Sequence, residues 1–175
     1  MIKEFKNIIS NKNISILLKE INDQKFPFYL VQYKKLQPRS PFLYHVILKR
    51  PEHKKPHDTM WNSAYGDLFL QIFKDFCKKA KIDNTEIYRA CLNLTFWPGE
   101  KQCGIHQDHN YPHRQLIIYL NNADPKSKTI IVNDKNKIIK EIIPKKNKGV
   151  MFDNVPHYHI YPTFGYRLAL IYTFK

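Results

Sequence analysis

The sequence predicts a mostly β protein with helices near its N-terminus, an α+β fold whose strands form a sandwich or barrel. Two observations lead to this fold class. From residue 86 onward, short β-prone runs alternate with turn residues, and no helical period appears. In the first half, segments space their apolar residues as amphipathic helices do. Helices first and closely spaced strands afterwards indicate strands with helices packed on one side.

The length of the chain predicts one domain. Its 175 residues contain no internal repeat and no low-complexity linker that would divide them. A domain of this size buries roughly 70% of the surface that its unfolded chain would expose, so a hydrophobic core is enough to stabilise it. We therefore expect residues 1–175 to fold as a single unit.

The N-terminal region contains the first predicted elements. Across residues 2–21 the apolar side chains form two sets at helical spacing, separated by a polar break at 11–13, which predicts one interrupted helix or two short ones. Residues 27–33 and 42–49 are rich in aromatic and branched side chains and are predicted to be strands. Residues 51–58 are polar, contain two prolines, and predict a loop.

Residues 66–80 predict an amphipathic helix that packs on a sheet, because most of their apolar side chains recur on one helical face. After this helix the predicted elements are all strands. They cover residues 86–97, 115–120, 129–133, 138–143, 150–152, 157–161 and 167–174.

The charge of the chain is strongly basic, with a formal net charge of +14. Such a charge ordinarily indicates a polyanionic partner such as nucleic acid. Here the excess is mainly lysine, scattered through a sequence also rich in Asn and Ile. The densest runs, within residues 49–55 and 145–148, fall where loops are expected. A solvated basic surface is therefore the preferred interpretation, with nucleic acid kept as an alternative partner.

Cysteine usage and the N-terminus predict the compartment. The three cysteines form no CxxC pair, and their odd number argues against a disulfide framework, which favours a reducing environment. The N-terminus carries charges throughout, and no apolar run approaches the roughly 20 residues of a membrane span. We expect a soluble cytoplasmic protein with no membrane partner.

The segment with the clearest chemistry is WPGEKQCGIHQDHNYPHRQLIIYLN, residues 97–121. His106 and Asp108 are separated by one residue, so on an extended backbone an imidazole and a carboxylate share a face. His157, near the C-terminus, is the candidate third ligand. Two histidines and one carboxylate on one side of an ion leave positions open for a cosubstrate and O₂, as in non-haem Fe(II) centres.

A buried cation is predicted ten residues after His157. On the last strand, Arg167 shares a face with Ala169, Ile171 and Thr173. A guanidinium among small and apolar neighbours needs an anionic partner, because burying an unpaired charge is very costly. That partner is either a bound ligand or, in the structural alternative, an Asp or Glu side chain.

Taken together, WPG, HQD, RQLIIYLN, FDNVPH and the ending H-x7-G-x-R resemble the Fe(II)- and 2-oxoglutarate-dependent dioxygenase superfamily, specifically its prolyl-hydroxylase-like branch. The resemblance covers residues 87–174. It implies a double-stranded β-helix, or jelly roll, in residues 86–175, which would hold the metal and cosubstrate site. Residues 1–85 would then support this core and contact the substrate.

The resemblance also implies roles for individual residues. His106, Asp108 and His157 would be the Fe(II) ligands, with O₂ and 2-oxoglutarate completing the reaction. Arg167 would bind the distal carboxylate of 2-oxoglutarate through paired hydrogen bonds. Tyr119 matches a tyrosine that donates its hydroxyl to the same carboxylate.

Several positions extend this site or depart from the family pattern. Asn93 and Thr95 alternate on the strand before HQD and could face the cosubstrate. Trp97 stands where relatives often have Tyr, and the Gly-Gly pair that commonly follows YLN is missing. His159 shares a strand face with His157 and is the alternative ligand, although the spacings to Gly165 and Arg167 favour His157.

These features predict a hydroxylase acting on a protein side chain or amino acid, with substrate contacts from residues 42–49 and 51–61. Three alternatives stay open. A nucleic-acid oxygenase or demethylase would use the positive charge and stack a base on Tyr44, Trp61 or Tyr65. A metal-binding jelly roll would lack oxygenase activity, and a plain β-fold interaction module would bind no metal.

Two further histidines in the central segment, His109 and His113, are expected to face solvent or substrate. His109 follows HQD directly, and His113 lies four residues further on.

Overall fold

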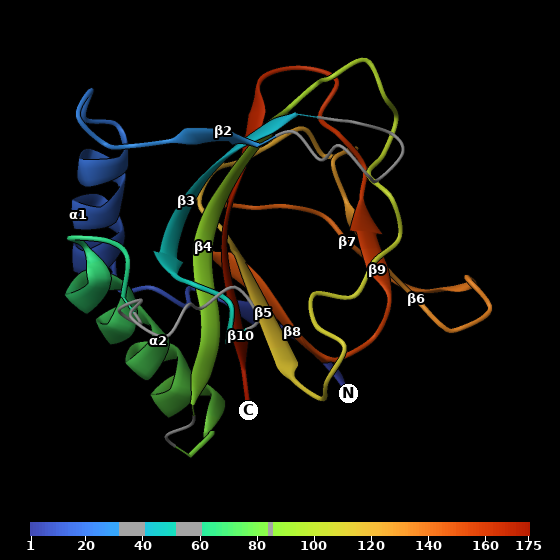
Figure 1. Cartoon of the computed structure of the whole chain (residues 1–175), viewed down its shortest axis with the longest axis horizontal. Coiled ribbons are helices and arrows are strands. Elements are labelled where there is room, and N and C mark those ends of the chain that lie inside the picture. The colour runs from blue at the N-terminus through green and yellow to red at the C-terminus, as the bar shows by residue number, and fades with distance from the viewer. Residues whose placement is uncertain (32–40, 52–60, 84–85) are drawn as a thin grey trace.

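The computed structural model describes residues 1–31, 41–51, 61–83 and 86–175. Within these ranges the chain forms a helical layer and two β-sheets (Figure 1). The elements in chain order are β1 (Ile2–Lys6), α1 (Asn11–Ile21), β2 (Tyr29–Val31), β3 (Phe42–Leu48), α2 (Gly66–Ala80), β4 (Ile87–Phe96), β5 (Arg114–Tyr119), β6 (Thr129–Val132), β7 (Ile138–Ile142), β8 (Lys148–Asp153), β9 (His157–His159) and β10 (Tyr166–Phe174).

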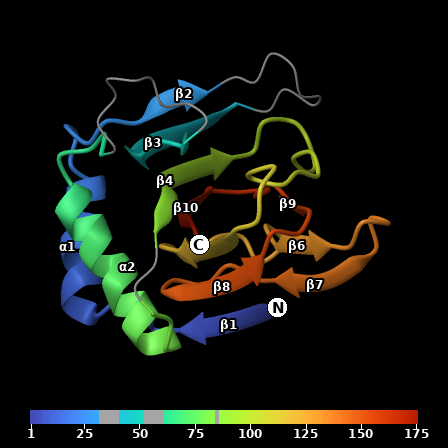
Figure 2. The ribbon, with the colours of Figure 1, turned by 60° about the horizontal axis from the view of Figure 1, so that its bottom comes forward.

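The strands form one large and one small sheet, and every observed pairing is antiparallel. The large sheet has the order β1-β8-β5-β10-β4-β3-β2, and the small sheet has the order β7-β6-β9. Figure 2 shows the small sheet beside the large one, on the side away from the helices. An apolar cluster that includes Ile117, Ile131, Ile142 and Ile171 fills part of the space between the sheets.

The helices cover the outer face of the large sheet, and α2 matches the helix predicted at 66–80 (Figure 1). Phe69, Ile72, Phe73 and Phe76 are almost completely buried against the sheet. Burying each of these side chains contributes roughly 1.5–3 kcal/mol. The hydroxyl of Tyr172, on β10, donates to the carbonyl of Phe69 at 2.7 Å, which joins the helix to the centre of the sheet.

The helical prediction for residues 2–21 is correct only in its second part. Residues 2–6 form β1, which pairs along its length with β8. Ile2 and Phe5 have a spacing that also suits a helix, but pairing with β8 provides backbone hydrogen bonds that a single helical turn would not. Helix α1 begins after Ser10, whose side chain accepts from the backbone N–H of Asn13 at 3.2 Å.

The remaining N-terminal predictions agree with the structure in part. The strand at 42–49 is confirmed as β3. Strand β2 is shorter than the predicted 27–33, and residues 32–33 lie outside the described part of the chain. The predicted loop at 51–58 also lies outside it, except for Pro51.

Strand β10 occupies the centre of the large sheet, between β5 and β4, and its two faces divide as the sequence predicts. Leu168, Leu170, Tyr172 and Phe174 belong to the core beneath the helices. The alternate residues, beginning with Arg167, face the small sheet. This inner face is the floor of the candidate site. None of the described helices is long and apolar enough to cross a membrane.

Candidate active site

A cavity of about 470 Å³ lies between the two sheets. Its walls come from β3, β4, β5, β6, β9 and β10 and from the segment that contains HQD. Six of the seven predicted site residues line it: Asn93, Thr95, His106, Asp108, His157 and Arg167. A second hollow of about 320 Å³ near Trp97 and Lys126 contains none of them.

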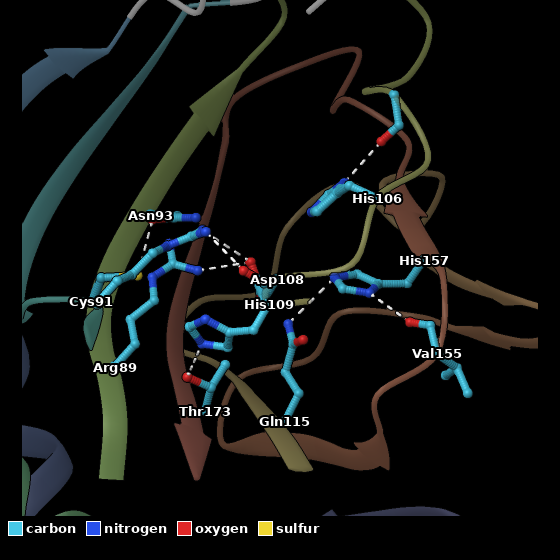
Figure 3. A network of polar contacts seen from close by, with 12 residues as sticks. Arg89, Cys91, Asn93, His106, Asp108, His109, Gln115, Val155, His157 and Thr173 are labelled. Carbon is cyan, nitrogen blue, oxygen red and sulfur yellow. Dashed lines mark hydrogen bonds and ion pairs between the residues drawn. The ribbon is translucent and has the colours of Figure 1, made fainter. Parts of the chain in front are cut away.

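His106 and His157 are cross-strand partners. Each backbone N–H donates to the carbonyl of the other residue, at 3.0 and 2.9 Å, so the two residues form an isolated antiparallel bridge. Their rings lie 4.6 Å apart between centroids. Two imidazoles 51 positions apart in sequence therefore enter the cavity side by side, as Figure 3 shows.

Both rings bond a backbone carbonyl through Nδ1, which makes Nε2 the candidate metal-binding nitrogen of each. Nδ1 of His106 donates to the carbonyl of Gly104 at 2.8 Å, and Nδ1 of His157 donates to that of Val155 at 3.2 Å. Nε2 of His157 accepts from the amide of Gln115 at 3.3 Å (Figure 3). Burial, together with the nearby His106 ring, lowers the pKa of His157 to about 3, so this imidazole is neutral. Metal-binding histidines have this arrangement, with one ring nitrogen bonded to a carbonyl and the other carrying a lone pair.

Asp108 is paired with two arginines. Its Oδ1 accepts from Arg89 at 2.8 Å and from Arg50 at 3.1 Å, and Arg50 also donates to its backbone carbonyl at 2.8 Å. Burial alone would raise the pKa of this carboxyl, but the charge of Arg89 and the neighbouring histidines hold the pKa well below its usual range. Figure 3 shows the Asp108 carboxylate directed at Arg89. In this arrangement, no three His, Cys, Asp or Glu side chains of the described residues converge as ligands of one ion.

The donor set nevertheless fits a metal. Both imidazoles have Nε2 on the side opposite their carbonyl bonds, the ring of His157 is neutral, and the carboxylate beside them is ionised. A carboxylate offers about four lone-pair sites on two oxygens, so the bonds to Oδ1 leave capacity for an ion.

Arg167 is a buried cation at the other end of the cavity, with 3% of its surface exposed. Its Nη2 donates to Oγ1 of Thr129 at 2.9 Å, and its guanidinium lies 5.3 Å from the ring centroid of Tyr119. Its Nε has no hydrogen-bond partner. Among the described residues, no carboxylate forms an ion pair with Arg167. The structural alternative, a salt bridge to Asp or Glu, therefore has no support in this part of the chain.

Tyr119 does not line the cavity, although it lies beside Arg167. Its side chain is fully buried and its hydroxyl donates to Oγ1 of Thr129 at 2.7 Å. Thr129 itself lines the cavity. It thus stands between the tyrosine hydroxyl and the space where a ligand would bind.

Asn93 and Thr95 point to the cavity from β4 and have polar partners there. Asn93 Oδ1 accepts from the thiol of Cys91 at 3.4 Å, and the Thr95 hydroxyl donates to the carbonyl of Arg167 at 3.4 Å.

His109 and His113 do not face solvent, which corrects the sequence prediction. They are 4% and 6% exposed. The ring of His109 stacks on Tyr111 at 4.7 Å and its Nε2 contacts the hydroxyl of Thr173 at 2.7 Å. A tyrosine that stacks on the ring removes it from water, and the sequence spacing did not reveal this contact.

Three aromatic residues that the sequence analysis considered for the site, Trp97, Trp61 and Tyr65, lie outside the larger cavity. Trp97 is 62% exposed and is not among the residues that line the larger cavity. Trp61 and Tyr65, suggested as base-stacking residues, pack against the core beneath the helices.

The lining residues that the sequence prediction omitted include Arg89, Cys103 and Thr129. A signal for Arg89 was present, because it lies on the same strand face as Asn93 and Thr95 and side chains alternate along a strand. Cys103 and Thr129 carried no comparable signal, because their partners come from β9 and β10.

Comparison with solved structures identifies the fold. The chain superposes with a TM-score of 0.80 on a 2OG-Fe(II) oxygenase family oxidoreductase from Burkholderia pseudomallei, at 11% identity, over 99% of this chain and 84% of that one. It superposes with a TM-score of 0.67 on a prolyl hydroxylase from Trichoplax adhaerens in complex with a hypoxia-inducible-factor peptide fragment, at 12% identity, over 99% and 82%. A third similar structure is the non-haem alpha-ketoglutarate-dependent carbocyclase SnoK of nogalamycin biosynthesis, with a TM-score of 0.64 at 8% identity, over 99% and 78%.

No protein-family profile and no curated protein sequence matches the chain. The similarity is therefore one of fold, and it agrees with the family that the sequence motifs resemble. The chain has the fold of the 2OG-Fe(II) oxygenases.

Proposed function

We propose that this protein is an Fe(II)- and 2-oxoglutarate-dependent oxygenase that hydroxylates a protein side chain or an amino acid. The observation that carries the proposal is Arg167, a buried cation without a carboxylate partner in the described structure, in the same cavity as the neighbouring histidines His106 and His157. A cavity with a cation at one end and metal donors at the other suits a small dicarboxylate that binds metal through its far end.

The metal would be held by Nε2 of His106, Nε2 of His157 and the carboxylate of Asp108. Fe(II) with bound 2-oxoglutarate supplies the activation of O₂ that C–H hydroxylation requires. The protein keeps both imidazoles in the ligand tautomer through the carbonyls of Gly104 and Val155. Arg89 and Arg50 keep the Asp108 carboxylate ionised and in place.

The distal carboxylate of 2-oxoglutarate would bind at Arg167 and Thr129. The guanidinium retains Nε as an unused donor, and Thr129 already lines the cavity. Tyr119 acts one step further away, through its hydrogen bond to the Thr129 hydroxyl. Charge-assisted bonds of this kind are shorter and about twice as strong as neutral ones.

We assign different roles to residues 86–175 and to residues 1–85. In this proposal residues 86–175 form a double-stranded β-helix that carries the metal and cosubstrate residues. Residues 1–85 support it through α1, α2 and β3, and also reach the cavity, since Phe42 and Arg50 line it. These two side chains are the candidates for contact with the primary substrate.

A second candidate is a metal-binding protein of this fold without oxygenase activity. The pairing of Asp108 with two arginines favours it, because a carboxylate that already neutralises two guanidiniums is a weaker ligand. The nucleic-acid alternative is less well supported, because Trp61 and Tyr65 are partly buried and pack against the hydrophobic core.

Anaerobic titration of the metal-free protein with Fe(II) and then 2-oxoglutarate tests the proposal. The proposal requires a weak visible charge-transfer band that appears only when the keto acid chelates iron. We expect the band to be lost in His106→Ala and His157→Ala, and to need more 2-oxoglutarate in Arg167→Ala. Bound iron without a band in the wild type would instead support the second candidate.

A further inference from the structure

The smaller hollow, of about 320 Å³, lies where three segments that are distant in sequence meet. Its lining residues come from segments 97–101, 126–128 and 160–163, and we call it the Trp97 hollow. The N–H of Tyr161 donates to the carbonyl of Lys101, and the N–H of Ile160 donates to the carbonyl of Lys128, both at 3.0 Å. Backbone hydrogen bonds therefore join its walls to one another.

Exposed aromatic side chains lie at the Trp97 hollow and beside it. Trp97 lines the hollow and is 62% exposed, while Phe164 and Tyr166 are 66% and 45% exposed. Tyr166 lies opposite Phe96, the residue before Trp97, in the pairing of β10 with β4. Phe164 directly follows Thr163, which lines the hollow. Exposed groups of large aromatic side chains are typical of protein-binding surfaces, where Trp and Tyr are frequent anchors.

The charged side chains of the Trp97 hollow are mainly lysines. Lys101, Lys126 and Lys128 line it together with Glu100. Lys128 is paired with Glu141 at 2.6 Å, whereas Lys101 and Lys126 are exposed and form no ion pair within the described part of the chain. The net charge of the whole chain, +14, has the same sign. Carboxylates of a partner would therefore complement this surface and be attracted to it before contact.

The arrangement favours an acidic peptide over a nucleic acid. Single-stranded nucleic acids bind along a continuous basic groove, but here Glu100 lies in the lining and Glu141 neutralises Lys128. The volume is at the lower end of the range for ligand sites, roughly 300–1,000 Å³. With Trp97 and Ile160 as apolar walls, the hollow accepts one bulky side chain while carboxylates on either side of it reach the lysines.

We propose that the Trp97 hollow binds an acidic peptide segment of a partner protein. One aromatic side chain of that segment enters the hollow against Trp97, and the flanking carboxylates pair with Lys101 and Lys126. The site goes beyond the proposed function, and binding there requires neither metal nor 2-oxoglutarate. Its occupant would lie next to the candidate active site, because Tyr161 lines both cavities.

The test measures binding of short labelled peptides to the full chain by fluorescence anisotropy. The probe is fluorescein-labelled Glu-Asp-Phe-Asp-Glu. Two comparison peptides carry the same label: Gln-Asn-Phe-Asn-Gln lacks the charges, and Glu-Asp-Ala-Asp-Glu lacks the aromatic ring. We expect the probe to bind about tenfold more tightly than either comparison peptide, and to bind more weakly as the salt concentration rises. Equal binding of all three peptides, or no binding of the probe, would overturn the proposal.

Variants locate the site on the surface. Lys101→Gln with Lys126→Gln should weaken binding of the probe about fivefold, the effect of losing two exposed ion pairs. The matched control is Lys19→Gln with Lys74→Gln, which removes two exposed lysines from α1 and α2 on the outer face of the large sheet. It should bind the probe as the wild type does. Equal weakening by both double variants would show that only the overall charge attracts the peptide, and would overturn the site.

Two further measurements test the apolar part of the site and the class of partner. Trp97→Ala should weaken binding of the probe about tenfold and reduce the preference for the peptide with Phe over the one with Ala. An unchanged preference would contradict insertion of the ring beside Trp97. Displacement of the bound probe by a single-stranded oligothymidine, in wild type but not in the Lys101→Gln, Lys126→Gln variant, would identify nucleic acid as the occupant and overturn the proposal.

Discussion

Arg89 donates from Nη1 to Oδ1 of Asp108 at 2.8 Å, and both side chains are almost fully buried. The pair joins β4 to the segment that carries HQD, so it fixes the position of one candidate metal ligand relative to the large sheet. The same carboxylate also pairs with Arg50 at 3.1 Å. The candidate metal site and the stability of the fold therefore depend on the same carboxylate.

The first prediction concerns this ion pair. Arg89→Met should lower the free energy of unfolding by about 3 kcal/mol at pH 7, because it leaves a buried carboxylate with a single, more exposed partner. Urea denaturation measures the change. Because the pKa of Asp108 is lowered, the stabilisation is complete above about pH 4 and is lost as the pH falls further. The double variant Arg89→Met with Asp108→Asn should be more stable than Arg89→Met alone, and a less stable double variant would contradict the pairing.

The second prediction concerns acid sensitivity in the metal-free protein. The pKa of His157 is about 3 when folded and roughly 6.5 when unfolded. Between these values the unfolded chain binds a proton that the folded chain does not, so stability falls as the pH decreases, by at most about 1.4 kcal/mol per pH unit. His157→Gln cannot take up this proton. The difference in unfolding free energy between wild type and variant should therefore change from pH 7 to pH 4, and a constant difference would exclude a neutral buried His157.

Much of this architecture could be predicted from the sequence because its patterns are local. Alternation along β10 separated Arg167 from the core residues Leu168 and Leu170, and the period of 66–80 gave α2. The prediction for residues 2–6 was wrong because their partner strand, β8, lies about 145 residues later, and a local period contains no information about that pairing.

The candidate site was less predictable than the fold for the same physical reason. His106 and His157 could be selected by residue type and order, but the partners of Asp108 and His159 come from other strands and loops. Hydrogen bonds between segments far apart in the chain cannot be predicted from a periodic pattern in the sequence. Alternation on β4 would have identified Arg89, whereas the sequence pattern could not have indicated that Cys103 contacts His159.

The third prediction concerns Thr129, which accepts from both Tyr119 and Arg167 through one hydroxyl oxygen. Thr129→Val keeps the shape of the side chain but leaves two buried donors without their acceptor, so the free energy of unfolding should fall by about 2 kcal/mol. Thr129→Ser retains the hydroxyl and is the matched control. Chemical denaturation of both variants measures the effect, and equal stability of the valine and serine variants would show that the hydroxyl is not an important acceptor.

The last prediction separates function from stability at Arg167. In the described structure this buried guanidinium has a threonine hydroxyl and an aromatic face as neighbours, but no carboxylate. Replacing an unpaired buried charge with an apolar side chain of similar length removes a desolvation cost, so Arg167→Met should be at least as stable as the wild type without ligand. The same change removes the cation that 2-oxoglutarate needs, and binding should weaken about 100-fold. Thermal unfolding with and without 2-oxoglutarate measures both effects: the ligand should raise the melting temperature of the wild type but not that of the variant. A variant that is strongly destabilised without ligand would instead mark Arg167 as a structural residue, because a side chain kept for binding contributes its favourable energy only when the ligand is present.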